Sequence, residues 1–313
     1  MPNLAGFPSL DTLVSRVRDL WPEHSIFIEK SFAERSPGVM SVSERVAACV
    51  LRLSSDVEGG LDRLCDDYRF LCEKIVLPEE FHFRRYGSYR LSSFADAMRE
   101  CYANAPFMAR YVNGILVSTV FWSNHAHAMS SYVLEYLPSL KPGSDLLEIG
   151  PGHGLFLYFA AKSSSAASVS GWDVSPTSVG HTQRALALLG VSRPVTLTCQ
   201  NMFEAVPENE GPRFDAITMS EVLEHLEDPV AALQRAREWL RPDGSIWVNV
   251  PANSPAPDHI FLIDSPEHAC ELVRKAGFEI LSSQAFPMTG TTLEKARKGK
   301  LTISCIVVGR RAA

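Results

Sequence analysis

The residues best suited to chemistry stand in one short stretch, LLEIGPGHG, at residues 146–154. Its glycines allow the backbone to turn sharply and to approach a ligand, because glycine has no Cβ in the way. The carboxylate Glu148 precedes them, and a second carboxylate, Asp173, ends the next apolar run. Asp173 could accept hydrogen bonds from both hydroxyls of a ribose, although DVSP also resembles a helix cap. The pattern predicts a site for a nucleoside-containing ligand. The glycines are Gly150, Gly152 and Gly154.

The details of the loop indicate which nucleoside. A dinucleotide loop, G-x-G-x-x-G, would have its third glycine where Leu155 stands, and Pro151 lacks the N–H that a pyrophosphate needs. Glu148 would repel a diphosphate and suits a ligand with positive charge. S-adenosylmethionine fits, because it carries a sulfonium and an ammonium and no phosphate. NAD shares the ribose requirement, so a nicotinamide oxidoreductase remains an alternative, as does a tight turn without a ligand.

The elements that must position these residues can be predicted from residue 139 onward. Short apolar runs alternate there with amphipathic ones, which predicts a doubly wound parallel sheet covered by helices. Two strands, at roughly 280–286 and 301–309, follow the last helix with only a loop between them, so we expect the last strand to be antiparallel. The expected strands are DLLEIG, SVSGWD, VTLTCQ, FDAITMS, SIWVNV, FEILSSQ and LTISCIVVGRR.

The first 138 residues have helical periodicity and no convincing strand pattern. Ser41 and Glu44 form a capping-box pattern, and the helical run at 92–103 starts with a serine cap. Pro106 opens a long helical segment that we expect to break near Asn124. We therefore predict two domains: a helical cap that binds the acceptor at 1–138 and a ligand-binding α/β domain at 139–313.

From residue 140 to the end, the sequence resembles the class I S-adenosylmethionine-dependent methyltransferases. The resemblance implies a Rossmann-like sheet of seven strands with an antiparallel last strand. It also implies that Glu148 and the three glycines line the methionine end and that Asp173 binds the ribose. Many members carry an aspartate where Asn201 stands. The motifs are LLEIGPGHG, GWDVS, NMFEAVP, FDAITMSEVLEHLEDP, LRPDGSIWV, GFEILSS and TISCIVVGRR. The residues expected to complete the cofactor site are Asn201 and Met202 at the adenine, and Ser220.

Methyl transfer is an in-line displacement, so an acceptor must be oriented and, where needed, deprotonated. Glu224 and His225 cluster after the fourth strand. Small-molecule O-methyltransferases, which this stretch resembles, use a histidine there as general base; here Glu224 stands at the matching position and His225 is displaced by one. The loop VNVPANSPAPDHIF supplies His259, the third candidate catalytic residue. The expected acceptor-binding residues are Trp122, His125, His127, Asn253 and Asp258.

Histidines from three segments are also candidate metal ligands: His225, His259 and one of His125 and His127, of which His127 is the candidate chosen. The further ligand would be Glu224 or Asp258. Together with this carboxylate the histidines could hold a divalent metal that polarises a 2-oxo acid for carbon methylation, as in a small set of methyltransferases. No H-x-x-x-H pair is present, and histidines that only pack or face solvent are the alternative. A group of arginines at 84–90 could clamp an acceptor carboxylate, or could be surface arginines on a connecting loop.

The composition of the chain indicates which classes of binding partner to expect. The formal net charge is −6, no basic stripe runs along the chain, and the fourth strand lacks the N-P-P-aromatic signature of base amino methylation, so we expect no nucleic acid. The densest basic run, KARKGK at 295–300, is typical of a solvated loop. The longest apolar run falls short of the ~20 residues that span a bilayer, so we expect no membrane partner. Seven scattered cysteines and no signal-peptide pattern favour the cytoplasm.

The sequence therefore predicts an enzyme that transfers a methyl group from S-adenosyl-L-methionine to a small metabolite. A sensor that binds S-adenosylmethionine without turnover is the non-catalytic alternative. A homodimer through the helical N-terminal segment is a further expectation. The sequence leaves open the acceptor, the atom that is methylated and the need for a metal.

Overall fold

A computed structural model of the chain describes residues 4–33, 35–204 and 213–312. The chain divides into two compact units. The first comprises residues 1–130, 254–260 and 286–302, and the second comprises 131–253, 261–285 and 303–313. Two later segments thus group with the N-terminal helices. The expected domain boundary after residue 138 stays a prediction.

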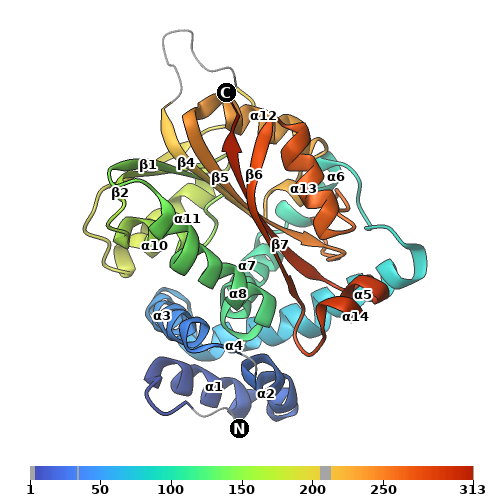
Figure 1. Cartoon of the computed structure of the whole chain (residues 1–313). Helices are drawn as coiled ribbons and strands as arrows, with labels where there is room; N and C mark the ends of the chain where they lie inside the picture. Colours follow the sequence, from blue (N-terminus) through green and yellow to red (C-terminus); the bar gives the residue numbers. More distant parts are fainter. Residues whose placement is uncertain (1–3, 34, 205–212, 313) are drawn as a thin grey trace. The chain divides into compact units, whose positions relative to one another are not determined.

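The second unit contains a seven-stranded sheet with the order β3-β2-β1-β4-β5-β7-β6, and Figure 1 shows its twist. Strands β1 to β5 pair in parallel, and β7 pairs antiparallel with β5. The predicted Rossmann-like sheet with an antiparallel last strand is confirmed. The strands are β1 Ser144–Ile149, β2 Ala166–Asp173, β3 Val195–Cys199, β4 Phe214–Ser220, β5 Leu240–Ala252, β6 Phe278–Pro287 and β7 Ile303–Arg311.

Helices cover both faces of this sheet. Glu148 pairs with Thr218, which pairs with Trp247, so these residues share one face, whereas Trp172 follows Gly171 and points to the other. Trp247 packs against Phe156, and Trp172 against a tryptophan of α12. The helical elements of this unit are η5 Tyr132–Tyr136, α9 Leu137–Ser139, α10 Leu155–Lys162, α11 Pro176–Leu188, η6 Leu223–His225, α12 Pro229–Trp239 and α13 Pro266–Lys275.

The first unit is helical, as the sequence predicted. Its long segment breaks at Trp122, two residues before the expected position. One element was not predicted: a short helix, α14, lies where only a loop was expected between the last two strands. The elements are α1 Pro8–Leu20, η1 Pro22–His24, α2 Ser25–Ala33, α3 Pro37–Leu53, η2 Ser54–Asp56, α4 Gly60–Phe70, η3 Leu71–Val76, α5 Leu77–Tyr86, α6 Phe94–Ala97, η4 Met98–Tyr102, α7 Ala105–Phe121, α8 Ser123–Ser131 and α14 Leu293–Gly299.

The capping box predicted at Ser41 is wrong. Helix α3 begins at Pro37, and its cap is Ser36, whose hydroxyl accepts the N–H of Val39. Glu44 instead lies on a helix face toward α1, where its two carboxylate oxygens accept the N–H groups of Ser9 and Leu10 at 2.9 and 2.8 Å. A carboxylate from one helix therefore caps the start of another, which favours negative charge.

Candidate cofactor and acceptor sites

The glycine loop connects β1 to α10. All three of its glycines have positive φ: +69° at Gly150, +50° at Gly152 and +76° at Gly154. A Cβ at Gly150 would lie 2.9 Å from Cγ2 of Val222, whereas a Cβ at Gly152 would meet no atom within 4 Å. The loop therefore presses against the segment after β4 on one side and leaves space on the other. This is the shape that close approach of a ligand to a backbone requires.

A residue far along the chain supports this loop. Thr182 of α11 is fully buried, and its hydroxyl donates to the Gly152 carbonyl oxygen at 2.8 Å. The Gly154 N–H donates to the Pro151 carbonyl oxygen at 2.8 Å. Thr182 could not be predicted from the sequence, because a threonine in an amphipathic helix is ordinary.

Glu148 lies beneath the loop at the end of β1 and is 1% exposed. Its carboxylate accepts the N–H of Leu157 in the first turn of α10, so it caps that helix. Its Oε2 is buried with no hydrogen-bond partner among the described residues. Burial raises the pKa of this carboxyl well above its usual range. A buried acceptor without a partner fits a cationic ligand, as S-adenosylmethionine is, and fits a diphosphate poorly.

The loop also contains His153, which the sequence analysis did not select. Its Nδ1 accepts the N–H of Leu155 at 3.3 Å. Burial lowers the pKa of this imidazole to about 4. At neutral pH the side chain is therefore neutral, so Glu148 has no positive partner within the loop itself.

Asp173 ends β2. Its Oδ1 accepts the N–H of Ser175 at 2.8 Å, and burial raises the pKa of its carboxyl. The cap of α11 is Ser175, whose hydroxyl accepts the Ser178 N–H at 3.2 Å. Asp173 therefore does not cap the helix itself, and its half-buried carboxylate at the strand end keeps the position expected for a ribose ligand.

Asn201 and Met202 follow β3. Asn201 is exposed, and its Oδ1 accepts the N–H of Phe203 at 3.0 Å, whereas Met202 is 5% exposed. The amide thus shapes its own turn while the thioether is available to pack against an apolar ring. The adenine contacts stay a prediction. The remainder of the NMFEAVP motif, residues 205–207, lies outside the described residues.

At the end of β4, Ser220 and Glu221 are held by a single side chain. Asn249 of β5 donates from Nδ2 to Ser220 Oγ at 3.0 Å and to Glu221 Oε1 at 2.9 Å. The main-chain carbonyl oxygen of Asn249 accepts the Glu221 N–H at 2.8 Å. Glu221 has φ +54°, a conformation that an L side chain adopts only when its surroundings enforce it. Asn249 was missed, although a polar residue within the apolar run SIWVNV was a signal for it.

Glu224 and His225 form the short helix η6 directly after this point. Glu224 is fully buried, and its Oε1 lies 3.8 Å from Nε2 of the half-buried His225. The carbonyl oxygen of Glu224 accepts the N–H of Phe261 at 3.0 Å. The two candidate catalytic residues thus come together in one turn of the second unit, at the carboxyl edge of its parallel strands.

Asp258 and His259 lie in the 254–260 segment of the first unit. Both are buried. The Asp258 carboxylate accepts hydrogen bonds from the hydroxyls of Tyr102 at 3.1 Å and Tyr111 at 3.0 Å. His259 Nδ1 lies 2.7 Å from the Ser254 carbonyl oxygen, which can only accept, so Nδ1 carries the proton and Nε2 carries the basic lone pair.

Tyrosines and a cysteine hold the same segment from other positions. The hydroxyl of Tyr89 accepts the Ser254 N–H at 3.1 Å, and its ring lies edge-on to the His259 ring. The Cys101 thiol donates to the Pro257 carbonyl oxygen at 3.1 Å. The Asp258 carboxylate anchors its own loop, and its expected contact with the acceptor stays a prediction.

The remaining acceptor-side residues lie near the junction of α7 and α8 or after β5. His127 Nδ1 donates to the Ser123 carbonyl oxygen at 2.7 Å, and His125 Nδ1 lies 3.1 Å from Ser118 Oγ, with its ring against Trp122. The two histidines therefore hydrogen-bond to different turns, as a spacing of two predicts.

Asn253 directly follows β5 and has φ +49°. Its Nδ2 donates to the Asp264 carbonyl oxygen at 2.8 Å. Its amide is thus used to shape the loop that follows. The candidate metal ligands divide between the units: His225 belongs to the second, and His127 and His259 to the first. Their joint binding of a metal stays a prediction.

The arginines expected near an acceptor have structural partners. Arg90 bonds to Glu79 at 3.0 Å, and Arg84 bonds to Glu80 at 2.5 Å and to backbone carbonyls of α14. Each guanidinium nitrogen of Arg84 therefore has a partner, whereas an acceptor-binding role for Arg85 and Arg90 stays a prediction.

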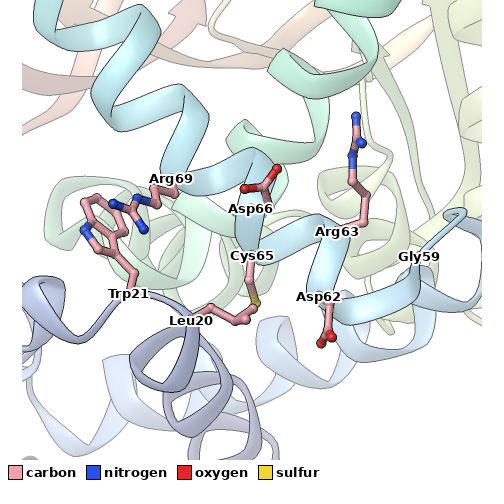
Figure 2. Close-up of a pocket in the computed structure, with 8 residues that line it drawn as sticks. All are labelled: Leu20, Trp21, Gly59, Asp62, Arg63, Cys65, Asp66 and Arg69. Atoms are coloured by element: carbon pink, nitrogen blue, oxygen red, sulfur yellow. The ribbon is translucent and has the colours of Figure 1, made fainter.

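A hollow of about 360 Å³ lies elsewhere in the first unit, beside Trp21 and Cys65 (Figure 2). Burial raises the pKa of the Cys65 thiol to about 12, so it is no nucleophile at neutral pH. The hollow therefore offers no reactive group. Its charged side chains are each paired within the unit: Asp62 with Arg16, Arg63 with Asp67, Asp66 with Arg110 and Arg69 with Glu73.

Comparison with known proteins agrees with this geometry. The sequence profile of a family described as a methyltransferase domain matches residues 121–283, more than half of the chain. The chain belongs to this methyltransferase family. Its class is that of the class I S-adenosylmethionine-dependent methyltransferases, as the sequence predicted, and S-adenosyl-L-methionine is the methyl donor of that class.

Two curated relatives are ubiquinone biosynthesis O-methyltransferases. One, from Xanthomonas campestris pv. campestris (strain B100), is 30% identical over 132 residues, which is 42% of this chain and 53% of the relative. The other, from Alkalilimnicola ehrlichii, is 28% identical over 145 residues, 46% of this chain and 56% of the relative. The chain thus spans about half the length of the curated relatives it matches.

A solved structure, that of a putative methyltransferase from Bacillus halodurans C-125, aligns with a TM-score of 0.48 and 13% identity, over 58% of this chain and 98% of that one. No functional conclusion follows from it. Among the described residues, no helix combines the length and the apolar character that crossing a membrane requires.

Proposed function

We propose that this protein transfers the methyl group of S-adenosyl-L-methionine to an oxygen atom of a small-molecule metabolite. The observation that carries the donor half is the loop after β1, which has three glycines at positive φ and lies by a buried oxygen of Glu148 that has no hydrogen-bond partner among the described residues. The acceptor half is supported by the O-methyltransferase names of the two curated relatives. We also propose that the protein is located in the cytoplasm and forms a homodimer through its N-terminal helices.

The roles of the cofactor residues follow from their positions in the second unit. Glu148 Oε2 would accept from the ammonium group, the space beside Gly152 would receive the methionine chain, and Asp173 would accept both ribose hydroxyls. Ser220 would contribute at the end of β4, where Asn249 holds it. Asn201 and Met202 would flank the adenine.

On the acceptor side, the donor supplies an electrophilic methyl group, and the chain must orient a nucleophilic oxygen and take up its proton. His259 offers a basic Nε2 because its Nδ1 proton is committed to Ser254. His225 and Glu224 offer a second imidazole and a buried carboxylate. We propose His259 and His225 as candidate bases and Glu224 as the residue that orients His225.

The test is a cofactor-release assay on the full chain against a panel of phenols, catechols, amines and 2-oxo acids. We expect turnover with a hydroxyl acceptor and binding of S-adenosylhomocysteine in a titration calorimeter. Asp173→Ala should weaken that binding by about 1–3 kcal/mol, through lost ribose hydrogen bonds. Tight binding of NAD(H) without binding of S-adenosylhomocysteine would refute the donor assignment. Binding without turnover of any acceptor would favour a sensor.

A further inference from the structure

Two helices of the first unit form a surface that the proposed function does not use. Helices α5 and α14 lie side by side in Figure 1. Arg84 of α5 hydrogen-bonds to the end of α14. Its guanidinium donates to the carbonyl oxygens of Gly299 at 2.5 Å and Lys300 at 3.1 Å. Because these carbonyls end α14, a cation there is also favoured by the helix dipole. The two helices are therefore fixed to each other.

Large apolar side chains of α5 are exposed on this surface. Phe81 is 67% exposed and Leu77 is 48% exposed. Residues 77, 81 and 85 are spaced by four, so Leu77, Phe81 and Arg85 lie along one face of the helix. Phe83, which points elsewhere, is only 4% exposed. The helix thus buries one apolar side chain in its own unit and displays two others to solvent, next to an arginine.

The two segments that contain these helices carry more basic than acidic side chains. Residues 293–300 contain four basic side chains and one acidic, and residues 77–90 contain three arginines and two glutamates. The segments therefore carry a formal charge of about +4 within a chain of net charge −6. Both glutamates of residues 77–90 are paired with arginines. The exposed lysines and arginine of α14, together with Arg85, leave an excess of positive charge on the two helices that Arg84 joins.

We propose that this surface docks the protein on the face of an anionic phospholipid bilayer. Exposed aromatic and aliphatic side chains would enter the headgroup region, and the surrounding cations would lie over the phosphates. Docking of this kind needs no spanning segment. The sequence expectation of no membrane partner rested on span length alone and does not bear on it. An acidic protein or a nucleic acid would use the cations but would have less use for Phe81 and Leu77.

The test is co-sedimentation of the full chain with phosphatidylcholine vesicles, with and without phosphatidylglycerol. We expect binding that requires phosphatidylglycerol and decreases as salt is added. The double variant Phe81→Gln, Leu77→Gln should lower the bound fraction at least about fivefold, because apolar area entering the headgroups is lost. Leu281→Gln is the matched control, since Leu281 is 50% exposed on β6 and has no such basic surroundings in its strand.

Two charge-reversal variants distinguish vesicle binding through this surface from a general effect of net charge on binding. Lys295→Glu, Lys298→Glu should abolish vesicle binding, whereas Lys141→Glu, Lys162→Glu, which changes the net charge equally with exposed lysines elsewhere, should leave it in place. Circular dichroism would verify folding of each variant. Equal binding to neutral vesicles, or loss of binding in both lysine pairs alike, would overturn the proposal. So would binding to heparin or RNA that is stronger than to vesicles and unchanged by the Phe81 variant.

Discussion

At Gly152, the backbone conformation and the surrounding space make separable demands on a side chain. Its φ of +50° disfavours any L residue, yet a Cβ there would meet nothing within 4 Å. Gly152→Ala should therefore lower the free energy of unfolding of the cofactor-free protein by only about 1–2 kcal/mol, the cost of the left-handed conformation. Its affinity for S-adenosylhomocysteine should fall at least tenfold, because the methyl group occupies space meant for the ligand.

Gly143 is the matched control for this substitution. It precedes β1, has φ +87° and likewise has no atom within 4 Å of a built Cβ. Gly143→Ala should show a similar loss of stability in urea denaturation and unchanged binding in calorimetry. Equal loss of binding in both variants would mean that the effect at Gly152 comes from instability and not from contact with the cofactor.

The raised pKa of Glu148 predicts that the stability of the protein depends on pH. The pKa of this carboxyl is raised in the folded protein, so between its unfolded value of about 4.5 and its folded value the folded state binds more protons than the unfolded state. Its contribution to stability is therefore full below about pH 4.5 and is lost as the pH rises through the folded pKa. Glu148→Gln removes this loss. The Tm difference between variant and wild type, without cofactor, should move in favour of the variant as pH rises.

The same variant should bind S-adenosylmethionine more weakly, because the ammonium group would lose a carboxylate partner; a hydrogen bond to a charged group is worth about 1.5–3 kcal/mol. Differential scanning fluorimetry across pH measures the first effect, and calorimetry measures the second. A variant whose Tm follows the wild type in parallel at every pH would contradict the buried ionisation of Glu148.

At the scale of elements, the sequence predicted the second unit closely and the first less well. β4 begins and ends at the residues where FDAITMS does, because a short apolar run between polar segments is a distinct pattern. Glu44 was misassigned because a local capping pattern competes with a partner that is distant in sequence. Thr182 and Asn249 were missed for the same reason: their hydrogen bonds join elements whose proximity only the fold creates.

The 254–260 segment is an element without regular structure, and its hydrogen bonds to Tyr102 and Tyr111 define its shape. Tyr111 is 8% exposed, so Tyr111→Phe leaves the Asp258 carboxylate short of a buried donor. We expect this variant to lower the free energy of unfolding by about 1.5–3 kcal/mol, the value of a hydrogen bond to a charged group. Tyr86→Phe, at a position that is 60% exposed, should change it by less than about 0.5 kcal/mol.

Measurements of kcat and of cofactor affinity distinguish a loop that positions His259 from a loop that only contributes to stability. If the loop positions His259 as a base, Tyr111→Phe should lower kcat with the methyl acceptor and leave the affinity for S-adenosylhomocysteine unchanged. Adding Asp258→Asn to the Tyr111→Phe variant should recover part of the lost kcat. The asparagine keeps an oxygen acceptor for the one remaining hydroxyl, that of Tyr102. Unchanged kcat in a destabilised Tyr111→Phe protein would leave the loop with a structural role only.

At the scale of the whole molecule, the two units carry different parts of the proposed chemistry. All the expected cofactor residues belong to the second unit, together with His225 and Glu224, whereas His127 and His259 belong to the first. The donor site is therefore a property of one fold that many sequences share, and the motifs of that fold made it predictable. The candidate acceptor residues come from segments that lie far apart in the sequence, and no general pattern relates their spacing in sequence to a shared position.

The metal hypothesis is the prediction that most depends on the whole molecule, because its candidate ligands are distributed over three distant segments. If His225 and His259 bind a divalent metal, the purified full chain should contain close to one metal ion per chain by elemental analysis. His225→Ala, His259→Ala should remove it, since imidazole nitrogens supply the affinity. His82→Ala, His268→Ala, two half-buried histidines outside the candidate set, should retain it. Metal-free protein that keeps full methyl transfer in chelator would exclude a catalytic metal and leave His259 and His225 as bases alone.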